Sequence, residues 1–105
     1  MPPHEPLTFD EHVRAAIDSL PPHIAKALEN VAIVIEPENA EEPDLYGLFD
    51  APEYMPAKIA IYRNPLEEDF PDAAELEEQI RVTVLHELAH YFGFEEDRIA
   101  ELGYD

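Results

Sequence analysis

The chain of 105 residues carries 25 acidic and 6 basic residues, which gives a formal net charge of −19 at pH 7. Such an acidic protein repels nucleic acids and anionic membranes, so we expect neither as a partner. No segment has the apolar length of a transmembrane helix, and residues 1–6 lack the features of a secretory signal. The length suits one domain over residues 1–105, and the absence of cysteine fits a soluble, cytoplasmic protein.

Apolar spacing, prolines and capping residues predict an α+β fold. Residues 8–11 have the composition of a helix N-cap and first turn, and Pro21 and Pro22 end that helix. Predicted in chain order are a helix over 9–20, a helical turn over 24–28, strands over 31–36, 45–49 and 58–63, a long helix over 73–92 and a short helix over 95–102. Residues 37–44, 50–56 and 64–72 are predicted as loops. We therefore expect a small sheet of three or more strands packed against the long helix.

The pentapeptide His86-Glu87-Leu88-Ala89-His90 is the most informative motif in the chain. On a helix, residues i and i+4 project from one face, so His86 and His90 are placed to bind a single zinc ion together. Glu87 lies one step round the helix, where it can deprotonate a metal-bound water. The apolar residues of the preceding segment 80–85 anchor the helix in a core. The motif indicates a metal-dependent hydrolase with Glu87 as the catalytic base.

A third metal ligand is expected shortly after the motif. Gly93 can end the helix through the left-handed conformation, which returns a side chain three residues later toward the metal. That side chain is Glu96, and its neighbours Glu95 and Asp97 are alternative ligands. Another interpretation is that Gly93 is an ordinary helix cap and that the three acids form the solvated first turn of the last helix.

Four segments together resemble a known family: Thr83–Gly93, Glu95–Ile99, Glu101–Tyr104 and Ile59–Glu67. They are similar to the small bacterial zincin-like metallopeptidases, also called minimal zincins, and the similarity extends from about residue 9 onward. The H-E-x-x-H-x-x-G-x-x-E pattern is close to that of the metzincins.

The resemblance implies a compact zincin core, with a zinc site at His86, His90 and an acid after Gly93, and with Glu87 as the base. Peptides or proteins would then be the substrates, and an extended peptide would lie along an edge strand of the sheet. The family commonly has aspartate where Glu96 stands, which keeps the ligand chemistry but lengthens the side chain by one methylene.

A second departure concerns methionine. Metzincins place a methionine-containing turn beneath the metal, whereas Met1 and Met55 both precede the motif here.

Two alternatives to a peptidase stay open: a zincin-derived metal-binding or interaction domain with little turnover, and a metal-dependent hydrolase of nucleic acids. The net charge argues against the second.

Other polar residues are weaker candidates. The remaining histidines have no ligand at helical spacing and are expected at the surface or at helix caps: His4, His12 and His23. Three tyrosines are candidates for stabilising an oxyanion: Tyr62, Tyr91 and Tyr104. Arg63 and Arg98 are either partners of acids near the site or members of surface ion pairs.

Overall fold

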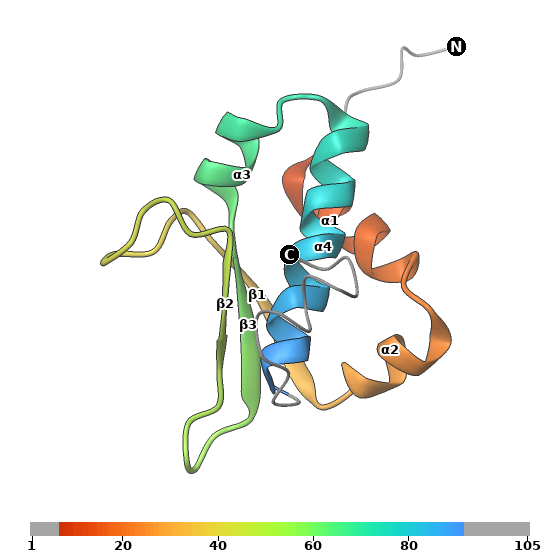
Figure 1. Ribbon diagram of the computed structural model, residues 1–105, viewed down its shortest axis with the longest axis vertical. Coiled ribbons are helices and arrows are strands. Elements are labelled where there is room, and N and C mark those ends of the chain that lie inside the picture. The colour runs from red at the N-terminus through yellow and green to blue at the C-terminus, as the bar shows by residue number, and fades with distance from the viewer. Residues whose placement is uncertain (1–6, 92–105) are drawn as a thin grey trace.

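The computed structural model describes residues 7–91, and this part of the chain forms four helices and three strands (Figure 1). In chain order these are α1 (Phe9–Asp18), α2 (Pro22–Ala27), β1 (Val31–Glu36), β2 (Gly47–Asp50), β3 (Ala57–Tyr62), α3 (Arg63–Asp69) and α4 (Ala73–Tyr91). The predicted α+β class is confirmed. Within residues 7–91, no helix combines the length and the apolar character that crossing a bilayer requires.

The three strands form one sheet in the order β1-β3-β2. β1 is parallel to β3, with Val31 opposite Ala57, and β2 is antiparallel to β3, with Gly47 opposite Ile61. Residues 59–62 of β3 are all buried, as expected for a central strand whose side chains alternate between two covered faces. β2 is an edge strand of this sheet.

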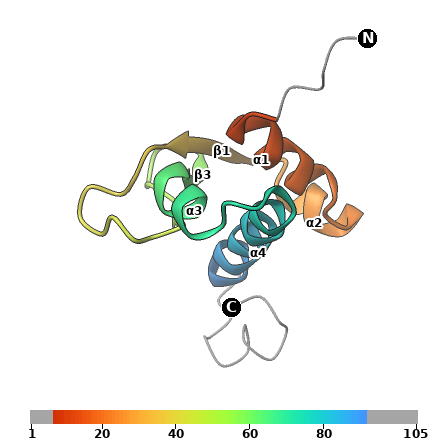
Figure 2. The same ribbon diagram turned by 90° about the horizontal axis from the view of Figure 1, so that it is seen from above.

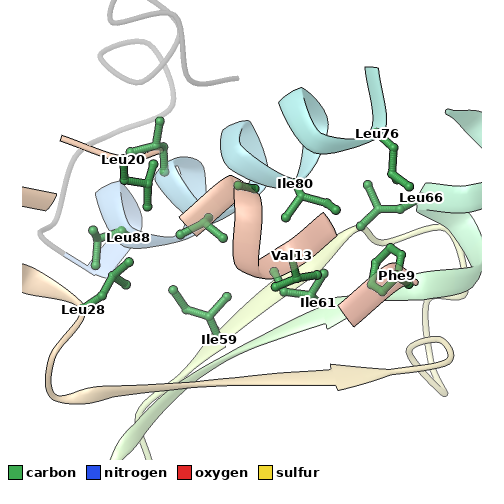
Figure 3. Packing of buried hydrophobic residues seen from close by; sticks show 13 residues of the cluster. Phe9, Val13, Leu20, Leu28, Ile59, Ile61, Leu66, Leu76, Ile80 and Leu88 are labelled. Carbon is green, nitrogen blue, oxygen red and sulfur yellow. The ribbon is translucent and has the colours of Figure 1, made fainter. Parts of the chain in front are cut away.

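The hydrophobic core lies between the sheet, α1 and α4 (Figure 3). Ile80, Val84 and Leu88 recur every fourth residue along α4 and are almost completely buried. They face Ile59 and Ile61 of the central strand within one apolar cluster. Figure 2 shows α4 on one side of the sheet and next to α1. This packing fixes the position of α4, and with it the H-E-x-x-H motif, relative to β2.

The segment predicted as a loop over residues 64–72 contains a helix, so that prediction was wrong. A proline such as Pro65 usually indicates irregular structure, but here it lies in the first turn of α3. There the missing N–H costs nothing, because the first four amides of a helix have no partner within it. Leu66 of α3 is completely buried and joins the core, which explains why the segment folds as a helix.

The other boundaries differ less from the predictions. β2 begins two residues later than expected, at Gly47, and β3 ends at Tyr62, one residue early. α1 ends at Asp18 rather than residue 20, and the predicted helical turn is the short helix α2. The long helix agrees as far as Tyr91. The predicted short helix over 95–102 lies outside the described residues.

Candidate metal centre and substrate cleft

The two histidines of the motif lie one turn apart on α4. Their Nε2 atoms are 3.0 Å from each other, and the rings meet edge to face with centroids 4.7 Å apart. Two nitrogens bound at about 2.0–2.1 Å to a tetrahedral zinc ion lie roughly 3.3 Å apart. The observed separation is close to this value, so His86 and His90 fit a shared metal ion.

Glu87 completes a cluster with these histidines. One ligand atom from each of His86, Glu87 and His90 falls within 4.8 Å of the others. Glu87 is buried, with 9% of its surface exposed, and its Oε1 accepts a hydrogen bond from the backbone N–H of Phe49 at 3.1 Å. A buried carboxylate is costly unless it is hydrogen-bonded, so this contact with strand β2 stabilises the side chain in its position.

The cluster opens onto a cleft between α4 and β2 with a volume of about 780 Å³. One wall is the segment Leu45–Phe49, and the other is a stripe of α4 consisting of Gln79, Val82, Thr83, His86, Glu87, His90 and Tyr91. The ring of Phe49 stacks on that of Tyr91 with centroids 4.7 Å apart. Apart from the histidines and Glu87, most of the lining side chains are apolar.

Residues 28–104 match the model of the zincin-like metallopeptidase family. The chain belongs to this family. The matched region includes the whole sheet, α3, α4 and the His–Glu–His cluster. Membership implies a bound metal, usually zinc, and peptide or protein substrates. A search of curated protein sequences found no match to the chain.

In this zincin-like chain, the structure brings together the three motif residues that the sequence singled out. The predicted third ligand, Glu96, and its alternatives Glu95 and Asp97 lie outside the described residues. Met55 lies in the connection between β2 and β3 with 69% of its surface exposed, so it does not form the floor of the site.

Of the candidate tyrosines, Tyr91 lines the cleft. Tyr62 is buried away from the cleft lining, and its hydroxyl accepts a hydrogen bond from Asn39 Nδ2 at 3.0 Å. Tyr104 lies outside the described residues. Tyr91 is thus the one of these three that the structure places beside the zincin motif.

His12 is not a surface residue, and that prediction was wrong. It is 8% exposed in α1, and its Nδ1 lies 2.7 Å from Oε2 of Glu77 in α4. The partner is distant in sequence, so the local pattern did not reveal it. His23 is exposed, as predicted, and Arg63 forms an exposed pair with Glu67 at 3.5 Å. His4 and Arg98 lie outside the described residues.

Tyr46 lines the cleft with its aromatic ring, and its hydroxyl is not available as a proton donor. Its hydroxyl donates a short hydrogen bond to Asp69 of α3, and this bond raises the pKa of Tyr46 to about 12. The ring also packs edge to face on Phe70, with centroids 5.6 Å apart. These contacts with the end of α3 and with Phe70 therefore support Tyr46, which lies in the cleft wall just before β2.

Sequence reasoning did not identify Gly47 as a residue of the site. It lies in β2 against Thr83 of α4, at a position where a Cβ atom would be 2.6 Å from the Thr83 methyl carbon. A single glycine within a predicted strand is a signal of close backbone approach, and this signal was present in the sequence.

Proposed function

We propose that the chain is a zinc-dependent peptidase in which His86, His90 and Glu96 bind the metal and Glu87 is the general base. The observation that carries the proposal is the pair of Nε2 atoms 3.0 Å apart, with the Glu87 carboxylate in the same cluster beside an edge strand. Glu96 is included because it stands three residues after Gly93 in the sequence. We propose one domain over residues 1–105 as the catalytic unit.

The mechanism assigns separate tasks to the residues of α4. A bound zinc ion lowers the pKa of a water ligand to about 7 and polarises the carbonyl group of the substrate. Glu87 accepts the proton of the attacking water and returns it to the amine that leaves. His86 and His90 would hold the ion through imidazole nitrogens.

The substrate lies along the outer side of β2 in this proposal. The carbonyl of Tyr46 accepts a hydrogen bond from the N–H of Tyr62, so it points toward β3. Because backbone groups alternate in direction along a strand, those of Gly47 and Phe49 point the other way, into the cleft. The N–H of Phe49 donates to Glu87 there, so a peptide would pair with the backbone groups of Gly47 and the carbonyl of Phe49. An extended peptide can pair with this edge, and the apolar walls favour a large apolar side chain beside the scissile bond.

The test compares wild type with Glu87→Gln, which keeps the size of the side chain but removes the base. Wild type is expected to bind one zinc per chain and to cut peptides with large apolar residues, with activity lost to a chelator and restored by zinc. Glu87→Gln is expected to fold and to retain zinc, but its kcat should fall by a factor of about 10²–10⁴, which is the usual contribution of general-base catalysis. A variant with full activity would show that the base is elsewhere.

Two further outcomes are informative. Replacing His86 and His90 with alanine removes zinc binding if they are ligands, and unchanged zinc content refutes the metal site. The alternative to a peptidase is a metal-binding domain with little turnover. Tight zinc binding without cleavage of a diverse peptide library would establish that alternative.

A further inference from the structure

Gly47 brings strand β2 unusually close to helix α4. A Cβ atom at this position would lie 2.6 Å from Thr83 Cγ2, 3.0 Å from the carbonyl oxygen of Ala60 and 3.8 Å from Glu87 Cγ. The first distance is shorter than any real Cβ contact, and the second involves backbone that has little freedom to move. Glycine is therefore required here for space.

Thr83 has little freedom to make room for a larger residue. Its hydroxyl donates a hydrogen bond of 2.7 Å to the carbonyl of Gln79, one turn earlier in α4. A β-branched side chain on a helix has few χ1 rotamers, and this bond selects the one that directs the methyl group toward β2. The contact between Gly47 and Thr83 consequently sets the separation of the strand and the helix.

The same contact lies next to the proposed base. Thr83 and Glu87 are separated by one helical turn and face β2 together. Gly47 and Phe49 are two residues apart on the strand, so their backbone N–H groups point in the same direction. The N–H of Phe49 donates to Glu87 Oε1 at 3.1 Å. The spacing at Gly47 therefore determines whether Phe49 can reach the carboxylate.

We propose that Gly47 is a positioning residue for Glu87: its lack of a side chain seats β2 on Thr83 and brings the Phe49 amide within hydrogen-bonding distance of the base. Holding one oxygen of the carboxylate also sets the direction of the other. This inference rests on the proposed role of Glu87 as the base, but its geometric part can be measured without any activity.

The size of the effect follows from the distances. For Gly47→Ala, moving the new Cβ from 2.6 Å to an ordinary contact of 3.4 Å requires a displacement of about 0.8 Å. A shift of this size along the Phe49–Glu87 direction lengthens their hydrogen bond from 3.1 Å to about 3.9 Å, where it no longer forms. Misplacing a catalytic group by about 1 Å costs roughly 10²-fold in rate, so we expect kcat to fall about 10–100-fold.

The structure also supplies a rescue variant. Thr83→Ser removes the methyl group that the new Cβ would strike and keeps the hydroxyl that bonds Gln79. Gly47→Ala combined with Thr83→Ser should therefore recover much of the loss, measured against Thr83→Ser alone. Recovery is expected to be incomplete because the contact with the Ala60 carbonyl remains. Asp50→Ala, an exposed change on the same strand, serves as the control for general effects on β2.

The experiment combines three measurements on the full chain: zinc affinity, kcat with KM, and the chemical shift of the Phe49 amide proton in nitrogen-15-labelled protein. The proposed ligands lie outside β2, so Gly47→Ala should bind zinc about as tightly as wild type while kcat falls. In the wild-type background, Glu87→Gln should strongly change the chemical shift of the Phe49 amide proton, because a hydrogen bond to a charged acceptor is replaced by one to a neutral acceptor. In the Gly47→Ala background this response should disappear.

Four outcomes decide the matter. An unchanged Phe49 response in Gly47→Ala overturns the proposal, whether or not the wild type is an active peptidase. Rescue by Thr83→Ser of both the amide response and kcat supports it, and a folded double variant without any recovery overturns it. If Gly47→Ala alone does not fold, replacing the Phe49 amide by an ester removes the same hydrogen bond with the side chain intact. An undiminished kcat in that ester variant also overturns the proposal.

Discussion

The partly buried contact between His12 and Glu77 is predicted to couple α1 to α4, the helix that carries the H-E-x-x-H motif. Nδ1 of His12 lies 2.7 Å from Oε2 of Glu77, with the two side chains 10% and 33% exposed. Hydrogen bonds to charged groups contribute about 1.5–3 kcal/mol to stability when buried. Because water reaches one third of the Glu77 side chain, we expect the lower end, a coupling free energy of about 1.5 kcal/mol.

The assay is a double-mutant cycle. The free energy of unfolding in urea is measured for wild type, His12→Ala, Glu77→Ala and the double variant. The cavity left by each truncation cancels in the cycle, so the coupling reports the contact itself. The exposed pair Arg81–Glu78 on the same helix, at 3.2 Å, is the matched control, with an expected coupling of about 0.3–0.5 kcal/mol. A coupling for His12–Glu77 no larger than that of the control would refute the argument.

Two further predictions concern an N-cap and a metal ligand. The backbone N–H and the side chain of Thr8 donate to Glu11 and lower its pKa below 4.5. Its ionised form therefore stabilises α1 above that pH and loses this effect as the pH falls through the lowered pKa. The stability difference between wild type and Glu11→Ala should shrink in acid, and a constant difference from pH 7 to 3 would contradict this. In zinc titrations Glu96→Ala should weaken binding, whereas Glu95→Ala and Asp97→Ala should not; equal losses would indicate a diffuse acidic patch.

The helices that were predicted correctly from the sequence are those whose own residues show a clear pattern, such as regular apolar spacing. α4 has apolar residues at regular spacing over five turns, and its boundaries agree with the prediction as far as Tyr91. α3 lacks such a signal because it has seven residues and contains Pro65. Its helical state depends on burying Leu66 in a core built by segments far away in the chain. A pattern of seven residues does not contain that information.

The same distinction between local and long-range contacts explains which parts of the candidate site could be predicted from the sequence. His86, Glu87 and His90 lie within one helical turn, so their proximity follows from their spacing. Contacts between distant segments were not predictable: Phe49 and Glu87 are 38 residues apart, and His12 and Glu77 are 65 apart. Gly47 gave a partial signal, since glycine in a strand indicates a close approach but does not name the residue approached.

The proposed metal ligands and the proposed base depend on different parts of the fold. The Nε2 atoms of His86 and His90 come together because the two residues lie one turn apart on α4. The orientation of Glu87 also depends on β2, through the Phe49 amide and the space at Gly47. Under the proposed roles, changes in this one edge strand separate metal binding from turnover. Under the same proposal, the H-E-x-x-H motif is enough to predict a metal site, whereas Gly47, which packs on Thr83, bears on whether that site catalyses a reaction.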